Sequence, residues 1–167
     1  RIGVVQDLNR LSFNSAMSHL RKTNVPLDAS VKLVGPRLLH NSQWGFLDPI
    51  DTPDGSHIGI HKNLSMFTVL STGVPREPMI RWLRDTASLI PMQCCTLDTL
   101  ASRVKVFVNG YWAGCIDDPY TVVQHIRLHR RHGLLPPYIS ATFDPPQETI
   151  FIYTDAGRLC RPVFYVT

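Results

Sequence analysis

Cysteine is scarce in this sequence, and long apolar runs are missing from it. The cysteines are Cys94, Cys95, Cys115 and Cys160, and no two of them form a C-x-x-C spacing. Such a pattern favours neither a disulfide framework nor a structural zinc site, and it is typical of free thiols in a reducing compartment. No apolar run approaches the ~20 residues that a membrane-spanning helix needs. We therefore expect no membrane partner.

The sequence also lacks the cluster of carboxylates on one turn, such as several Asp at alternate positions, that a two-metal catalytic site needs. Asp48, Asp51 and Asp54 fall three apart, and His57 and His61 follow them. A calcium loop spaces its ligands two apart, and a catalytic zinc helix needs Glu beside its first His. The pattern favours turn capping by Asp side chains, so we expect no catalytic and no metal-binding residue here. A metal-dependent phosphoesterase that uses these five residues stays open as an alternative.

Length and composition are those of a folded domain. The 167 residues suit one domain or two small ones, and apolar residues make up 44% against 18% charged. The first residue is Arg1 rather than Met, no signal peptide precedes it, and the last residues, PVFYVT, are an apolar run. We interpret the chain as an internal part of a longer protein.

Positive charge is concentrated in the first third of the chain. Residues 1–47 hold six Lys and Arg against two Asp, whereas residues 48–167 hold eleven of each sign. Four cations flank one polar loop that ends at Gly35-Pro36: Arg21, Lys22, Lys32 and Arg37. Guanidinium and ammonium groups placed in this way suit phosphate, so the cluster indicates a polyanionic partner. A solvated face whose counter-charges lie on other parts of the protein is the alternative.

Local patterns predict an α+β fold in two parts. Residues 1–72 read as an irregular, loop-rich segment with two helical pieces before residue 25 and extended segments at 39–44 and 58–69. The break Gly73-Val74-Pro75 marks the boundary to a second part, residues 73–167.

The second part is expected to be a small mixed module with β-hairpins. Pro78 can open a helix, a hairpin is expected to turn at Asn109-Gly110, and a helix is expected from Asp118-Pro119 to His132. We expect another hairpin with its turn at residues 155–157. His125, His129 and His132 lie among arginines, which favours a solvated basic face or a subunit contact over a metal stripe.

Seven runs of residues resemble one protein family. They are GVVQDLNRLSF, SHLRKTNVPL, PRLLHNSQWG, PIDTPDG, IGIHKNLS, VFVNGYWAG and IYTDAGRLCRP. In this order and spacing they resemble the second-largest, β-type subunit of multisubunit DNA-directed RNA polymerases. The form is closer to eukaryotic, archaeal and large-DNA-virus versions than to the bacterial one, which usually has Tyr at the position of Trp44. The resemblance implies a fork region at residues 1–72 and an external region at residues 73–167.

The resemblance also implies roles for single residues. His19, Arg21 and Lys22 would border the RNA–DNA hybrid, Lys32 would meet a DNA phosphate in a fork loop, and Arg37 would lie near the incoming nucleotide. Two further residues would belong to the wall of the active centre, where the family usually has Glu, and each shortens the side chain by one methylene. They are Asp51 and Asp54.

Partners and cofactors follow from the same resemblance. The expected partners are the DNA template, the nascent RNA, nucleoside triphosphates, the largest polymerase subunit and smaller subunits. Mg²⁺ is expected on the largest subunit and Zn²⁺ only in a part C-terminal to this segment, so no cofactor is expected within the chain and no activity from it alone. The expected location is the nucleus, or a cytoplasmic viral factory or virion for a viral protein. A purely structural subunit-interaction module is the competing hypothesis.

Overall fold

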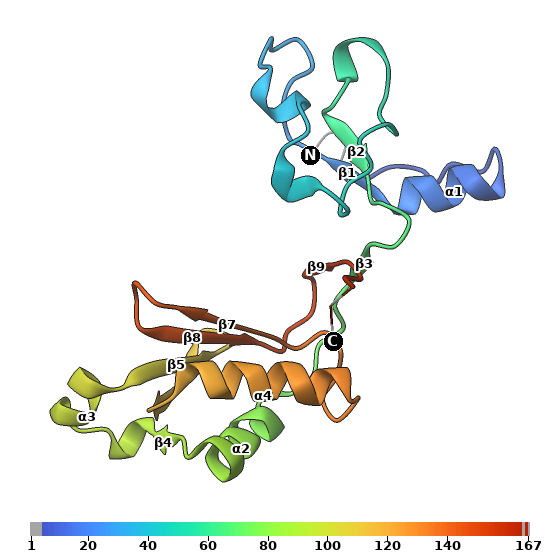
Figure 1. The fold of residues 1–167 in the computed structure, drawn as a ribbon. Helices are drawn as coiled ribbons and strands as arrows, with labels where there is room; N and C mark the ends of the chain where they lie inside the picture. Colours follow the sequence, from blue (N-terminus) through green and yellow to red (C-terminus); the bar gives the residue numbers. More distant parts are fainter. Residues whose placement is uncertain (1–4, 165, 167) are drawn as a thin grey trace. The chain divides into compact units, whose positions relative to one another are not determined.

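The structure is a computed structural model that describes residues 5–164 and residue 166. It contains two compact units: residues up to Val69 together with those from Leu159 onward, and Leu70–Arg158 (Figure 1). Both units mix helices with short strands, which confirms the predicted α+β class. Within the described residues, no helix combines the length and the apolar character needed to cross a bilayer. The domain division at residue 72 stays a prediction.

The first unit is built around a short two-stranded sheet. Helix α1 (Phe13–Leu20) begins where Ser12 Oγ accepts a hydrogen bond from Ser15 N. Strand β1 (Lys22–Asn24) pairs antiparallel with β2 (His61–Asn63). The chain between these strands holds the 3₁₀ helices η1 (Gly35–Arg37), η2 (Asn41–Gln43) and η3 (Gly55–His57). The pairing therefore closes the basic and aspartate-rich stretch into one large loop. Where the chain leaves and rejoins this unit, β3 (Val69–Leu70) pairs with β9 (Leu159–Cys160).

Polar contacts, rather than an apolar core, hold the first unit together. Among its described residues Ile60 is a buried apolar side chain, whereas Lys62, Asn63 and Thr68 are buried polar ones. Asn63 Nδ2 donates to the carbonyl of Asp51 at 3.0 Å, and Thr68 Oγ1 lies 2.9 Å from the carbonyl oxygen of Phe46. A buried polar group without a partner is costly, so this unit depends on these specific bonds.

Several predictions for the first unit were wrong. Only α1 is helical within residues 5–24, because the side chain of Asn9 accepts a hydrogen bond from Leu11 N and forms a local turn instead. Residues 1–4 lie outside the described residues. The expected extended segment 39–44 contains η2, where the ring of His40 accepts a hydrogen bond from Ser42 N. Residues 58–69 are extended only in part, at β2 and at Val69.

The second unit is a five-stranded mixed sheet with two main helices. In chain order it contains α2 (Arg76–Ala87), β4 (Ile90–Pro91), η4 (Met92–Cys94), α3 (Leu97–Ser102), β5 (Val104–Val108), β6 (Tyr111–Ile116), α4 (Pro119–Arg131), β7 (Ser140–Asp144) and β8 (Thr149–Tyr153). The strand order is β4-β6-β5-β8-β7, and only the β5–β8 pair is parallel.

Local signals predicted several elements of this unit. The β5–β6 hairpin turns at Asn109 and Gly110, whose φ angles are +51° and +77°, as a two-residue turn of this kind needs. Asp118 caps α4, and Pro119 is its first residue. Helix α2 begins two residues earlier than the expected Pro78, with Pro75 in the capping position.

The predicted second hairpin is wrong. Strand β8 does not turn back at residues 155–157 but pairs antiparallel with β7, which precedes it, and in parallel with β5. The turn between β7 and β8 includes Glu148, which has a φ angle of +47°. The sequence reasoning missed β7, and it had no means of detecting a parallel partner so far away in the chain.

One face of the sheet carries the core. Side chains from α2 and α4, including Leu83 and Ile126, pack with Val106, Ile150 and other sheet residues, and the partly buried Trp82 packs against them. On the alternate positions of the strands lies an aromatic row. Phe107 is opposite Trp112 and next to Phe151, with the two phenyl centroids 5.9 Å apart. These rings are partly exposed.

Candidate nucleic-acid interface

The basic cluster at the end of α1 contains one inward and one outward cation. Arg21, the C-cap of α1, uses Nη2 to donate to the carbonyls of Ser65 at 2.6 Å and Thr68 at 2.9 Å. Lys22 is exposed at the start of β1, and its side chain makes no hydrogen bond or ion pair with any described residue. Its ammonium group is therefore the accessible charge of this cluster.

His19 ties α1 to the segment before it. Its Nδ1 accepts a hydrogen bond from Asn9 N at 3.1 Å, and its Nε2 lies 2.9 Å from Oε1 of Gln6. His19 and Lys22 line a hollow of about 530 Å³ together with Asp7. This side chain is thus placed beside Lys22 but is bonded within the chain.

Arg37 organises the loop that precedes it. Its guanidinium donates to five backbone carbonyls at 2.6–3.2 Å, those of Ala29, Val31, Leu33, Ser56 and Ile58. A guanidinium has five N–H donors, so each donor of Arg37 has one carbonyl acceptor. Arg37 therefore fastens the loop at residues 29–33 to the chain around η3.

Lys32 lies at the outer side of this loop. It is exposed and makes no hydrogen bond or ion pair with the described part of the chain. The loop begins at Asp28, whose Oδ1 accepts a hydrogen bond from Ser30 N at 3.0 Å, and this bond holds the pKa of the Asp28 carboxyl below its usual value. Asp28 and Arg37 together fix the backbone on both sides of a free ammonium group.

Gly59 allows the chain after η3 to lie directly against the backbone of Arg37. Its φ angle is +72°, and a Cβ atom built on it would lie 2.6 Å from Cα of Arg37 and still closer to the Arg37 carbonyl oxygen. No side chain fits against rigid backbone at that distance. Sequence reasoning did not identify Gly59, although the glycines at positions 45, 55 and 59 indicate tight turns or a close approach between backbone segments.

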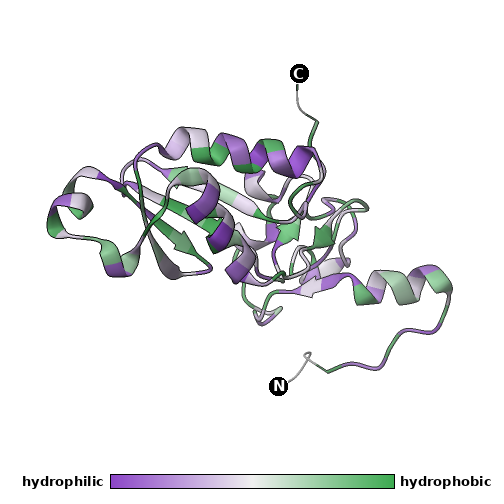
Figure 2. Cartoon of the chain, turned by 90° about the horizontal axis from the view of Figure 1, so that it is seen from below, coloured by the Kyte–Doolittle hydropathy of each residue, from purple (hydrophilic) through white to green (hydrophobic). Residues whose placement is uncertain are grey.

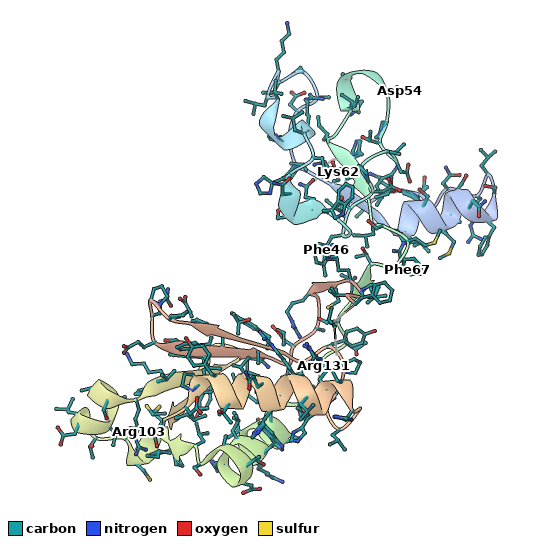
Figure 3. The ribbon with its side chains drawn as sticks, in the orientation of Figure 1. Phe46, Asp54, Lys62, Phe67, Arg103 and Arg131 are labelled. Atoms are coloured by element: carbon teal, nitrogen blue, oxygen red, sulfur yellow. The ribbon has the colours of Figure 1, made fainter. Side chains whose placement is uncertain are left out.

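Lys62 is the buried cation of the unit, and the sequence reasoning missed it. Its side chain is 8% exposed, and Nζ lies 3.1 Å from the Pro36 carbonyl and 3.3 Å from Oε1 of Gln43 (Figure 3). Lys62, Arg37 and Asp48 are among the residues that line a pocket of about 170 Å³. An ammonium group held by neutral oxygens adds positive potential beneath the loop without being exposed itself.

The aspartates act as turn residues to different extents. Asp48 Oδ1 accepts hydrogen bonds from Ile50 N at 2.9 Å and Asp51 N at 3.3 Å, which is the predicted capping role. Asp51 and Asp54 are exposed, and Asp54 precedes η3 without a side-chain cap bond. No three His, Cys, Asp or Glu side chains of the described residues form a group that could hold a metal ion.

The two histidines of this segment stack on each other. The ring centroids of His57 and His61 lie 5.4 Å apart. Burial, the neighbouring His57 and the charge of Lys22 lower the pKa of His61, and its Nδ1 is buried without a hydrogen-bond partner among the described residues. These effects favour the neutral form of the His61 ring.

The predicted site residues thus form two groups. His19 and Lys22 line one hollow, whereas Lys32 belongs to the loop that Arg37 fastens. Arg21 and Arg37 are bonded to carbonyls far away in the sequence, which no local pattern reveals. Their contact with nucleic acid stays a prediction.

Comparisons with known proteins match both units. The family model described as RNA polymerase Rpb2, domain 3, matches residues 6–70, and RNA polymerase Rpb2, domain 4, matches residues 106–167. The RNA polymerase II subunit RPB2 of Meyerozyma guilliermondii is 39% identical over 99% of this chain, and subunit 2 of Arabidopsis thaliana is 37% identical. The RNA polymerase III subunit RPC2 of Drosophila melanogaster is 35% identical over 99% of the chain.

The chain spans only a small share of these relatives, 13% of the yeast subunit, 14% of the plant subunit and 15% of the fly subunit. The similarity nevertheless runs through the whole chain and through both units. The chain therefore belongs to the family of second-largest subunits of DNA-directed RNA polymerases.

Proposed function

We propose that this chain lines the active-centre cleft of a DNA-directed RNA polymerase and contacts nucleic acid with Lys22 and Lys32. The observation that carries the proposal is the loop at residues 29–33. Three hydrogen bonds from the Arg37 guanidinium fix its backbone, and two more join it to the carbonyls of Ser56 and Ile58. The side chain of Lys32 in this loop is left free. A preorganised loop with an unpaired cation loses little conformational entropy when it binds a phosphate.

The proposal divides the basic residues by role. Lys32 contacts a DNA phosphate at the fork, and Lys22, beside His19, contacts the RNA–DNA hybrid. Arg21 and Arg37 position these groups through backbone carbonyls, and Lys62 adds a buried charge below them. Bond formation is assigned to Mg²⁺ and nucleoside triphosphates on the largest subunit, with the nucleus as the location. Zn²⁺ belongs to another part of this subunit.

The test replaces Lys32 by Ala in the full-length subunit of an assembled polymerase. Loss of one phosphate contact is expected to weaken retention of the template and to reduce the slope of log K against log [salt] by about 0.7–1. Lys105→Ala removes the same charge from an exposed position on β5 and serves as the matched control, with no expected change. An unchanged salt slope for Lys32→Ala would refute the contact.

A structural module is the second candidate function. It is favoured because all five N–H donors of the Arg37 guanidinium bond to carbonyls of this chain, which leaves none for a phosphate. In that case Lys32→Ala and Lys22→Ala leave DNA retention intact, while Arg37→Ala alters subunit assembly. The phosphoesterase alternative receives no support from the described residues, whose aspartates and histidines do not converge on a metal position.

A further inference from the structure

The side of α2 next to its buried face carries three arginines that the proposed function does not use. Arg76, Arg81 and Arg84 are exposed, while Met79 and Leu83 on the neighbouring side are buried. The arginines border a pocket of about 230 Å³ that lies entirely within the second unit. Its lining also includes Glu77, Ile80, Gln93, Tyr111 and Ala113.

The guanidinium groups in this pocket have unequal freedom. The Arg76 guanidinium lies over the Tyr111 ring, 4.6 Å from its centroid, and Arg76 Nε is 3.2 Å from a carboxylate oxygen of Glu77. The side chains of Arg81 and Arg84 form no hydrogen bond and no salt bridge with the residues that the structure describes. Two unpaired guanidinium groups therefore stand beside one that is held in place.

Charge in the second unit is segregated. Helices α2 and α4 together contain six arginines and only two acidic residues, and Figure 2 shows hydrophilic residues along both helices. The rest of this unit contains three basic and six acidic residues. The helical layer is thus complementary to an anionic partner, and one of its helices, α2, lines the pocket together with residues of η4 and β6.

The residues that line the pocket favour an acidic peptide over a nucleic-acid backbone. Ile80, Ala113 and the ring of Tyr111 give the pocket apolar surface among the arginines, and the Gln93 amide can bond a peptide backbone. A phosphate backbone has no apolar group that could cover Ile80 and Ala113, whereas a peptide can present carboxylates and apolar side chains together. Carboxylate side chains pair well with planar guanidinium groups.

We propose that this pocket is a docking site for an acidic segment of a partner protein. In this arrangement carboxylates of the segment pair with Arg81 and Arg84. An apolar side chain of the same segment covers Ile80 and Ala113.

The test uses the whole 167-residue chain and a fluorescent synthetic peptide in which Glu and Asp alternate with Leu and Phe. Fluorescence anisotropy is expected to show binding that weakens as salt is added. The double variant Arg81→Glu, Arg84→Glu is expected to weaken binding about tenfold or more, because it replaces two attractions by repulsions. The neutral pair Arg81→Gln, Arg84→Gln should weaken it less. Circular dichroism melting checks that each variant is folded.

The matched control is Arg127→Glu, which reverses an exposed charge on α4 outside the pocket lining. It should leave peptide affinity within about twofold. An equal loss with Arg127→Glu would overturn the proposal, because attraction would then be spread over the helical layer. Absence of peptide binding to the unaltered chain would also overturn it. So would tighter binding of a single-stranded oligonucleotide that the same double variant abolishes.

Discussion

Gly59 and Gly55 have nearly the same backbone conformation but very different surroundings. Their φ angles are +72° and +69°, yet a Cβ at Gly59 would meet the Arg37 backbone, and one at Gly55 would meet nothing within 4 Å. Gly55→Ala is expected to cost about 1–2 kcal/mol from the left-handed conformation alone. Gly59→Ala adds a clash with rigid backbone and should cost about 3 kcal/mol or more.

Denaturant unfolding of the whole chain, followed by a probe in the first unit, measures the difference between these two variants. Equal losses for Gly55→Ala and Gly59→Ala would mean that the close approach to Arg37 does not constrain the loop. A larger loss for Gly59→Ala is the expected result, because its Cβ would meet the Arg37 backbone.

His61 makes the stability of the first unit depend on pH. Its pKa in the folded chain is lowered, first by burial and then by His57 and Lys22. The unfolded chain therefore takes up the proton more readily. The stabilising contribution is complete above the ordinary value of 6.5 and is lost as the pH falls through the lower folded pKa.

The predicted result is that His61→Gln flattens the decline in stability on the acid side of neutrality. Urea unfolding at a series of pH values gives the slope. His132→Gln, at the exposed end of α4, is the control and should leave the slope unchanged. A slope that is the same in all three proteins would contradict the assignment.

At the scale of secondary-structure elements, the best-predicted parts are those with a local cause. The Asn109-Gly110 turn and the Asp118 cap each depend on two or three consecutive residues, and both are present. Strand β7 and the parallel β5–β8 pair depend on partners far away in the chain, so a local pattern did not indicate them.

The same distinction applies to the candidate site. An exposed lysine in a polar loop, Lys32, is visible in the sequence. The bond from Arg21 to Ser65, across 44 positions, and the burial of Lys62 are not, because each depends on chain folding between distant segments.

The N-cap of helix α4 allows the contribution of a single capping residue to stability to be measured. The Asp118 carboxylate accepts hydrogen bonds from Tyr120 N at 3.1 Å and Thr121 N at 3.2 Å, and bonds from the Thr121 side chain and backbone lower its pKa. Asp118→Ala leaves these N–H groups without their acceptor, so the melting temperature of the second unit should fall. Asp118→Asn keeps an oxygen acceptor and should retain most of the stability. Equal melting temperatures for Ala and Asn would argue against the cap.

At the scale of the whole molecule, the two units differ in what holds them together. The second has a continuous apolar core, whereas the first buries polar groups and leaves Phe13, Trp44 and Phe67 more than 60% exposed. Large exposed apolar side chains are typical of surfaces that other protein segments cover. The first unit therefore depends on neighbours more than the second does.

We expect residues 70–158, expressed alone, to fold with a cooperative thermal transition. Residues 1–69 joined by a short linker to residues 159–167, which complete the first unit, should give a broad transition and bind a dye specific for exposed apolar surface. Calorimetry and dye fluorescence distinguish the two outcomes. A sharp transition for this linked first unit and none for residues 70–158 would contradict this assignment of stability.

The two ends of the second unit lie side by side and are joined by backbone hydrogen bonds. Ser71 N donates to the Arg158 carbonyl at 2.8 Å, and Gly157 N donates back to the Ser71 carbonyl at 3.1 Å. Because the two ends of this segment lie close together, a short turn could replace it in the parent chain. The segment could also be inserted into an exposed loop of another protein at little entropic cost. Insertion or exchange of the second unit therefore requires no change in the conformation of the flanking chain.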